Sequence, residues 1–301
     1  MASGSQARSR EQLSELMMPR RPGRFKQFLY YFSRKPLGAV GVGLVVFVGL
    51  VALFAPVIAP FDYQAQNYDD LKVAPNLTYF FGTDQFGRDN FSRIVAGARI
   101  TLLVGFTAVL VGTGLGALLG LVSGYFMGMF DALVQRLVDM WMSFPDLILA
   151  LTIVAVFNNT LTTVILAIAA TILPRGVRVI RSSTISIRET DYVIAARAIG
   201  AASPRIIRRH VLPNTIAPFL IIMSSMFGTA ILTEAGLSYL GLGISEPFPS
   251  WGRMATVAAQ HAITAPWIVL FPGLAIMITV MGFAFAGDAL RDIFDPRLRG
   301  E

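Results

Sequence analysis

The sequence predicts an all-α membrane protein with about six transmembrane helices. Of its 301 residues, 54% are hydrophobic and 14% are charged, whereas soluble domains carry about 25% charged residues. The mean hydropathy of +0.63 agrees with this. The hydrophobic residues also gather in long runs, each able to supply the roughly 20 residues that a spanning helix needs. These three observations favour a membrane protein over a soluble one.

Six apolar stretches define the expected spans. The first, Leu37–Pro60, contains no charge and is too long for the hydrophobic region of a signal peptide, so we expect it to remain as a helix. The second, Ile100–Phe130, exceeds one straight span and should overrun into a turn. The other four lie at about Leu137–Phe157, Thr160–Ile180, Ile216–Leu242 and Trp267–Gly287.

The distribution of arginine and lysine predicts the orientation. These residues concentrate in the N-terminal tail, in the loop between the fourth and fifth spans and in the C-terminal tail. With six spans, all three regions lie on one side, which the positive-inside rule assigns to the cytoplasm. The expected organisation is therefore a cytoplasmic tail (1–36), a first helix with an external segment (37–99), a five-helix core (100–288) and a cytoplasmic tail (289–301).

The composition also excludes several functions. The net charge of +7 resides largely in short loops and tails, so it is interpreted as a topology signal and not as nucleic-acid binding. There are no cysteines, and the two histidines are too few for a metal site. None of the three lysines follows a glycine, so the Gly-Lys-Ser/Thr loop that binds nucleotide phosphates is missing. We expect no catalytic residue, no metal and no cofactor in this chain.

Glycines recur every fourth residue in the second span, at Gly112, Gly116, Gly120, Gly124 and Gly128. This spacing places them on one helix face, where a second helix can approach backbone to backbone. We interpret the face as static packing; a seam that slides is the alternative.

The loop from Thr190 to Asn214 is predicted to form two short helices. Thr190 is the expected N-cap of the first, with Asp191 in its first turn, and Gly200 is the expected stop. Ser203-Pro204 should begin the second helix, which we expect to end near Leu212. Its arginines lie mainly away from an apolar face.

The first of these helices is slim, because it contains Ala195, Ala196 and Ala198. A slim helix can lie in a groove of a partner protein, with Arg197 and the neighbouring arginines free to pair with acidic groups there. The alternative is a basic loop that lies on anionic lipid headgroups.

The loop resembles the EAA signature of importer permeases of the ABC (ATP-binding cassette) class. The shared residues are Ala195-Ala196, Gly200 and Leu212-Pro213, at the spacing of the signature. Ile194 stands where the signature has glutamate, and His210 where it has isoleucine. Further blocks are similar to the C-type permease of dipeptide and oligopeptide importers: Gly82-Thr83-Asp84, Gly87-Arg88-Asp89, Pro249-Ser250-Trp251-Gly252, Phe271-Pro272-Gly273-Leu274, Gly287–Asp292 and Asp295-Pro296-Arg297.

This resemblance implies a type I ABC importer permease core with a cytoplasmic coupling helix, in the inner membrane. The implied partners are a homologous B-type permease, two ATPase subunits that bind ATP and Mg²⁺, and an external substrate-binding protein. The ATPase subunits would push on the loop that contains Asp191, Ala195, Ala196, Arg197, Gly200, Leu212 and Pro213. The substrate would be a peptide, although related systems carry nickel chelates, opines or oligosaccharides.

Asp146 and Glu234 lie well inside expected spans, where ionisable groups usually face a cavity or a partner. Asp146 follows Pro145 in the third span, and it either lines the translocation path or pairs across a subunit interface. Glu234 in the fifth span is interpreted as structural, with substrate contact as the alternative. Asp131, Arg136 and Asp139 cluster where the second span turns into the third. Arg136 and Asp139 are three residues apart and can pair on one helix face, or the cluster forms a solvated cytoplasmic turn.

Two other functions remain open from the sequence. An ion-driven secondary transporter would often show repeated halves or several intramembrane carboxylates, and no duplication is obvious here. A membrane scaffold without transport activity is the second alternative.

Overall fold

The computed structural model describes residues 36–244, 247–259 and 261–294. Within these ranges all regular structure is helical, apart from one isolated bridge between Thr83 and Asp89. Five helices are long and apolar enough to cross a membrane, and one bent helix pair makes a sixth. The expected all-α protein with about six spans is therefore confirmed.

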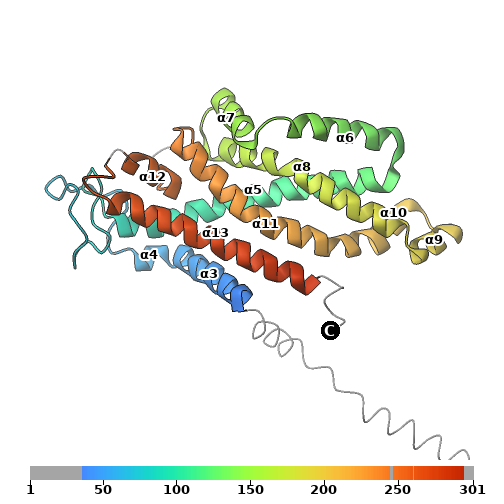
Figure 1. Cartoon of the computed structure of the whole chain (residues 1–301), viewed down its shortest axis with the longest axis horizontal. Coiled ribbons are helices and arrows are strands. Elements are labelled where there is room, and N and C mark those ends of the chain that lie inside the picture. The colour runs from blue at the N-terminus through green and yellow to red at the C-terminus, as the bar shows by residue number, and fades with distance from the viewer. Residues whose placement is uncertain (1–35, 245–246, 260, 295–301) are drawn as a thin grey trace, which may run out of the picture.

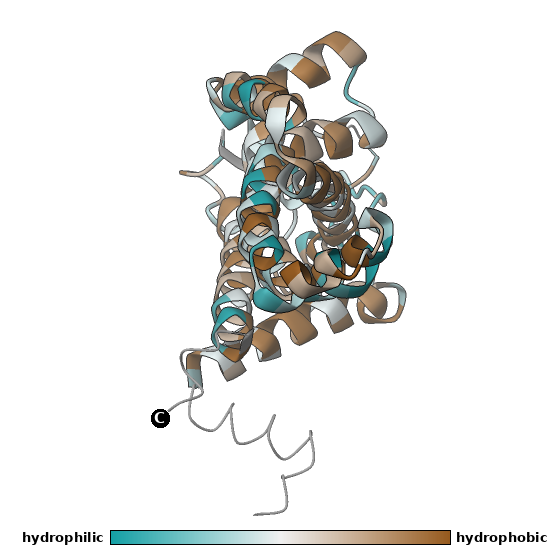
Figure 2. Ribbon diagram, turned by 90° about the vertical axis from the view of Figure 1, so that its right-hand side faces the viewer, coloured by the Kyte–Doolittle hydropathy of each residue, from teal (hydrophilic) through white to brown (hydrophobic). Residues whose placement is uncertain are grey.

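The spanning helices lie side by side along the long axis of the molecule (Figure 1). The segment that follows α4 lies at one end together with α12, and α9 and α10 lie at the opposite end. Viewed from the α9 end, hydrophobic residues predominate along the bundle (Figure 2). The helices are, in order, α3 (Pro36–Leu53), α4 (Ala55–Ile58), α5 (Asn90–Phe126), α6 (Gly128–Met142), α7 (Asp146–Phe157), α8 (Leu161–Arg188), α9 (Asp191–Ala198), α10 (Ser203–Ile206), the π-helical turn η1 (Ile207–Val211), α11 (Leu212–Tyr239), α12 (Trp251–Ala259) and α13 (Trp267–Phe294).

The glycine face of α5 packs on the backbone of α8. A Cβ atom at Gly112 or Gly116 would stand 2.5 Å from a carbonyl oxygen of α8, and one at Gly124 would stand 2.8 Å from another. Because only hydrogen fits at these positions, the two helices approach as closely as their backbones allow. The predicted helix seam is confirmed for four of its five glycines, whereas Gly128 lies beyond it at the start of α6, with open space around it.

Several predicted boundaries are wrong. The second span was expected to begin at Ile100, but α5 begins at Asn90, because the Asp89 carboxylate caps it by accepting a hydrogen bond from the Ser92 N–H at 2.8 Å. Residues 90–99, expected in the external segment, are thus the first turns of a long helix. The first span ends earlier than expected, at Leu53, and α13 continues past the expected end of the core to Phe294. The tails 1–35 and 295–301 lie outside the described residues.

The third expected span, Leu137–Phe157, is not one helix. It is divided between α6 and α7, whose axes are bent by 88°. Pro145 lies at the break in an extended conformation and precedes the first residue of α7. Proline lacks the N–H that a continuing helix needs and disfavours helical backbone in the residue before it. The structure therefore has a sharp elbow where one span was expected.

The Gly82-Thr83-Asp84 and Gly87-Arg88-Asp89 blocks form a compact turn at the start of α5. The Asp84 carboxylate accepts hydrogen bonds from the Arg88 N–H at 2.9 Å and from Arg88 Nε at 2.6 Å, and both side chains are buried. Gly87 adopts φ +71°, and a side chain there would collide with the backbone of Asn67. These blocks therefore fix the segment between α4 and α5 on the end of the bundle.

Candidate coupling loop and charged helix face

The helix α9 and the turn after it follow the prediction closely. α9 ends at Ala198, and Gly200 adopts φ +81°. The Gly200 N–H donates to the Arg197 carbonyl oxygen at 3.0 Å, and the Ala201 N–H donates to the Ala196 carbonyl oxygen at 3.1 Å. This is the glycine-terminated helix end that the sequence indicated. Thr190 occupies the N-cap position, but its hydroxyl donates to the Ile187 carbonyl oxygen and does not cap α9.

The second predicted helix does not end near Leu212. α10 begins at Ser203 and passes through η1 directly into α11, so Pro213 lies inside a continuous helix, just after the π-helical turn. Proline has no N–H to donate to the preceding turn, and the wider turn of η1 accommodates this missing hydrogen bond. The Asn214 side chain donates to the His210 carbonyl oxygen at 2.6 Å. The loop is thus continuous with α11 and is not a separate hairpin.

The loop is fastened to the ends of α5 and α8 by an apolar cluster. Val193 of α9, Ile206 of α10 and Val211 of η1 are each no more than 1% exposed. They pack with Leu121 and Tyr125 of α5 and with Ile180 of α8. Because three segments of the loop share this cluster, they move with α5 and α8 as a packed unit.

Most of the sequence-predicted coupling residues lie on the outer surface of this loop. Ala196 alone is partly buried in the cluster; the exposed ones are Asp191, Ala195, Arg197, Gly200, Leu212 and Pro213. The sequence did not single out Ile199, which is 86% exposed, or Tyr192, which is about half exposed. The available signal for these two residues was the surplus of apolar side chains in and just after α9, of which Val193 is the one fully buried in the cluster. Large apolar side chains on an exposed helix mark a surface that a partner covers.

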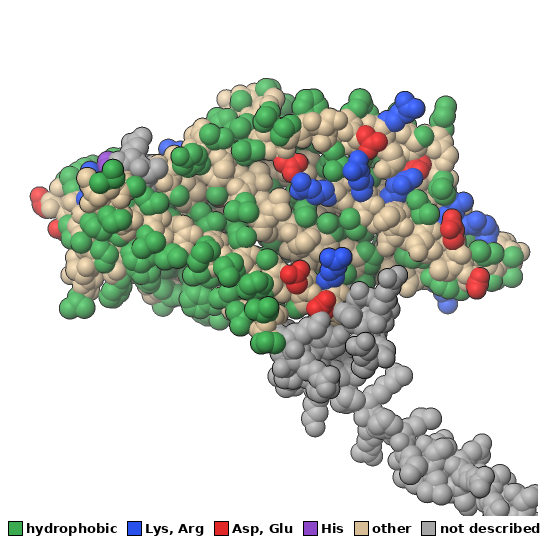
Figure 3. Space-filling view, viewed as in Figure 1, with side chains coloured by type: hydrophobic (Ala, Val, Ile, Leu, Met, Phe, Trp, Pro, Cys, Tyr) green, Lys and Arg blue, Asp and Glu red, His purple; other side chains and the backbone are tan. Residues whose placement is uncertain are grey.

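A line of ion pairs joins α8 to the α6–α7 elbow. Arg175 pairs with Asp146 at 2.5 Å and Arg178 pairs with Asp139 at 2.5 Å. Arg181 binds both carboxylate oxygens of Asp131 at 2.6 Å. Figure 3 shows acidic and basic side chains side by side on the surface over α6 and α8. The sequence placed these arginines only in the general positive-charge pattern and did not pair them with these acids.

Two predictions about acidic residues are affected. Asp139 pairs with Arg178 of α8 and not with Arg136, which is exposed on α6. Asp146 has a partner within its own chain, Arg175, and remains 39% exposed. The prediction that Asp146 meets a substrate, or alternatively a second subunit, stays a prediction.

Glu234 belongs to α11 and is buried where this helix packs against the segment that enters α12. Its side chain is 1% exposed and accepts a hydrogen bond from the Ser238 hydroxyl at 2.8 Å. The Ser238 hydroxyl is also 3.3 Å from that of Ser250. A Cβ at Gly252 would stand 2.6 Å from the Ala235 backbone, so the two segments are in close contact. This burial agrees with the structural interpretation of Glu234.

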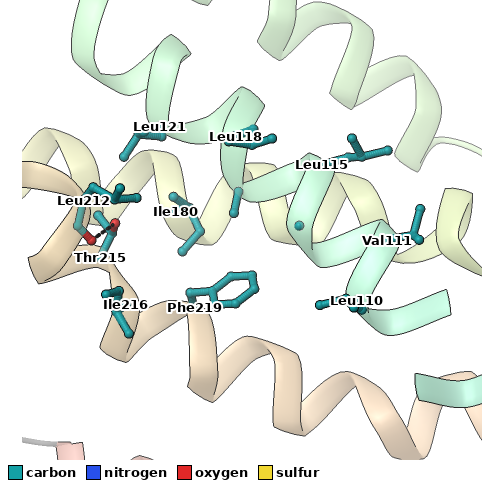
Figure 4. A pocket seen from close by; sticks show the side chains of 12 residues that line it. Leu110, Val111, Leu115, Leu118, Leu121, Ile180, Leu212, Thr215, Ile216 and Phe219 are labelled. Atoms are coloured by element: carbon teal, nitrogen blue, oxygen red, sulfur yellow. Dashed lines mark hydrogen bonds between the residues drawn. The ribbon is translucent and has the colours of Figure 1, made fainter. Parts of the chain in front are cut away.

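An apolar groove of about 600 Å³ lies between α5 and α11 and reaches α8 near the coupling loop. Figure 4 shows Leu115 and Leu118 of α5 on one side and Ile216 and Phe219 of α11 on another. The Thr215 hydroxyl in its wall donates to the Leu212 carbonyl oxygen of its own helix at 2.9 Å. The groove offers a peptide no charged side chain, so we do not assign it as a substrate site.

Comparison with known families adds to this geometry. Residues 116–300 match the model of the family described as binding-protein-dependent transport system inner membrane component. Residues 23–76 match the N-terminal transmembrane domain of oligopeptide transport permease C.

Individual relatives are peptide permeases. The chain is 42% identical over 275 residues to the dipeptide transport system permease protein DppC of Alkalihalophilus pseudofirmus, covering 91% of this chain and 89% of that protein. It is 38% identical to the glutathione transport system permease protein GsiD of Escherichia coli, covering 91% of each chain.

Two solved structures share the fold. A chain of the inward-facing MetNI methionine ABC transporter has a TM-score of 0.58 at 19% identity and matches 67% of this chain and 97% of its own. A chain of an amino acid ABC transporter with histidines has a TM-score of 0.53 at 17% identity, with 68% and 95% covered.

Proposed function

The chain belongs to the family of binding-protein-dependent transport system inner membrane components, and we propose that it forms half of the translocation pathway of an ATP-driven peptide importer. The family supplies the multi-pass membrane component of ABC importers, in which separate subunits hydrolyse ATP. The relatives named above transport dipeptides and glutathione, and a peptide is accordingly the proposed substrate class for this chain.

One observation carries the proposal: the packed loop at the α9 end, where the EAA-like residues are exposed. Tyr192 and Ile194 of α9 and Ile199 directly after it are exposed, while Val193 fixes the helix to the bundle. An apolar surface rimmed by exposed arginines suits the groove of a protein partner better than lipid headgroups, which would select for charge alone. We propose that an ATPase subunit binds this surface through Asp191, Ala195, Ala196, Arg197, Gly200, Leu212 and Pro213.

The remaining partners and the orientation follow from this assignment. With the coupling loop in the cytoplasm, both termini are cytoplasmic, and the segment between α4 and α5 faces an external binding protein together with α12. A homologous permease would cover the apolar faces of α6 and α7, and ATP and Mg²⁺ would be bound by the ATPase subunits. We further propose that Asp146 lies on the translocation path, because one of its oxygens pairs with Arg175 while the side chain stays 39% exposed.

The test is transport by the complete complex in proteoliposomes. Labelled dipeptides and tripeptides are supplied with the external binding protein on one side of the membrane. Uptake is measured with and without ATP on the other side, where the ATPase subunits lie. The proposal predicts uptake that requires ATP and is insensitive to collapse of ion gradients. Uptake that persists without ATP and follows an ion gradient would identify a secondary transporter instead, and a nickel chelate or oligosaccharide as the preferred substrate would correct the substrate class.

A further inference from the structure

The helix α6 has an unusually weak apolar attachment to the bundle. Among its residues Gly128–Met142, the buried ones are Asp131 and Val138. Its large apolar side chains point outward: Met129 is 90% exposed, and Leu133, Leu137 and Met140 are half exposed or more. Helices in a membrane are held together by close packing and by polar contacts, because lipid tails accommodate exposed apolar side chains. α6 has little close packing on the bundle, so its polar contacts with α8 decide its place.

Two ion pairs provide that attachment. Arg178 and Arg181 are three residues apart on α8 and therefore project from the same side of that helix. They reach Asp139 and Asp131, which are eight residues apart on α6, about two turns. The inner pair, Asp131–Arg181, has bidentate geometry, and its carboxylate also accepts a hydrogen bond from the Ser123 hydroxyl of α5. Bidentate, partly buried pairs are the strong kind.

α8 is also the helix that leads into the coupling loop. Glu189 and Thr190 are the residues between its last residue, Arg188, and the first residue of α9. The Thr190 hydroxyl donates to the Ile187 carbonyl oxygen at 2.6 Å, and Ile180 of α8 shares the buried cluster with Val193 of α9. A displacement of α9 must therefore displace α8, and the arginines of α8 hold α6.

We propose that Arg178 and Arg181 are positioning residues that clamp α6 to α8, so that α6 follows the coupling loop as one body with α8. This α6 clamp, the pairs Asp139–Arg178 and Asp131–Arg181, rests on the proposed function of the loop. It extends that function by assigning the route along which movement reaches the elbow before α7. In this route the α5–α8 glycine seam and the clamp act on the same stretch of α8, because the Arg181 backbone also lies against Gly120 and Gly124 of α5.

The experiment uses the complete complex, with spin labels on α6 at Ala132→Cys and on α8 at Ser186→Cys, both exposed positions. The chain has no cysteine of its own, so both labels are unambiguous once the partner subunits are cysteine-free. The clamp predicts one narrow α6–α8 distance distribution that is the same with and without ATP. Arg178→Gln combined with Arg181→Gln should broaden it, because ~1 kcal/mol of lost pairing raises the ratio of detached to attached α6 about fivefold, and it should lower the peptides transported per ATP.

Three further variants make the test specific. Arg136→Gln removes an exposed charge of α6 that is in no ion pair within the described chain, and it should change neither readout. Asp139→Arg alone places two arginines side by side and should broaden the distribution, and adding Arg178→Asp should narrow it again, which tests the clamp even where the double glutamine variant fails to assemble.

Two results would overturn the clamp: an unchanged distribution in all these variants, or an α6–α8 distance that ATP changes in the unsubstituted complex. The distance measurement decides the clamp by itself. Failure of ATP-dependent uptake in the unsubstituted complex would instead count against the proposed function.

Discussion

Gly116 of α5 lies against the backbone of Leu173 on α8, so closely that a Cβ atom at position 116 would stand 2.5 Å from the Leu173 carbonyl oxygen. Gly114, two residues earlier on the same helix, faces the open groove and has nothing within 4 Å of its Cβ position. The two glycines are therefore a matched pair: substitution at Gly116 tests the contact with α8, and the same substitution at Gly114 measures the effect on the helix alone.

Gly116→Ala should destabilise the permease by about 1–3 kcal/mol, because overpacking forces the two backbones apart. Gly114→Ala should be neutral or stabilising by up to about 1 kcal/mol, since alanine is the better helix former. Thermal unfolding of the purified complex in detergent compares them. Equal melting temperatures for the two variants would show that the seam is not a tight static contact.

Labelling of single cysteines tests the orientation. A cysteine introduced at Ser203 in the loop should react only with a reagent that reaches the cytoplasmic side, and one at Asn76 only with a reagent supplied from outside. A third at Ser5, in the N-terminal tail, should behave like the one at Ser203. Reaction of positions 5 and 76 from the same side would rule out the six-span topology with α6–α7 as one span.

Asp146 and Arg175 can be separated by comparing their neutral variants. If Asp146 meets the ammonium group of a peptide, Asp146→Asn should raise the KM for uptake several-fold more than Arg175→Gln does, with the complex still assembled. A pair that is merely structural would give the same small change for both, because either substitution breaks the same contact. Uptake kinetics at saturating binding protein provide the comparison, and loss of assembly with Asp146→Asn would assign the residue to an interface.

The structural role of Glu234 predicts a difference between two substitutions. Glu234→Gln keeps an acceptor for the Ser238 hydroxyl, so stability and uptake should stay close to those of the unsubstituted protein. Glu234→Leu removes the 2.8 Å acceptor of the Ser238 hydroxyl and leaves it with the longer 3.3 Å contact to the Ser250 hydroxyl, so the change should cost about 1–3 kcal/mol of stability. Melting temperatures and uptake are measured for both. A glutamine variant that is stable but has lost uptake would mean that the carboxylate contacts the substrate.

The sequence predicted the helix α9 and its glycine stop well, because the signals there are local. A slim helix, Gly200 and the residues around it determine the backbone within a few positions. The same holds for the glycine seam on α5, where a period of four already specifies one face. Such features can be predicted without knowing which segments pack against them.

The elbow and the α6 clamp could not be predicted in the same way. Leu137–Phe157 has the length and polarity of one span, and whether Pro145 kinks a helix or ends it depends on the neighbours that satisfy the freed backbone groups. The pairing of Asp131 with Arg181 joins residues 50 positions apart, so only the packing of α6 on α8 could reveal it. The π-helical turn lies just before Pro213, where proline interrupts the hydrogen bonds of the helix that continues from the loop into α11.

The central claim is that the loop ending at Gly200 couples this permease to ATP hydrolysis, and one pair of glycines tests it most directly. Gly200 and Gly241 have nearly the same backbone, φ +81° and +82°, and open space at the Cβ position, but lie at the two ends of α10–η1–α11. An aspartate at either position strains the backbone by about 1–2 kcal/mol.

Gly200→Asp should redirect α9 and thereby reduce ATPase-subunit retention and substrate-stimulated hydrolysis in the purified complex, with the permease still inserted in the membrane. The Gly241→Asp complex should keep both its ATPase subunits and its substrate-stimulated hydrolysis. If Gly200→Asp retains the ATPase subunits and full stimulation, or if Gly241→Asp loses them equally, this loop is not the coupling element.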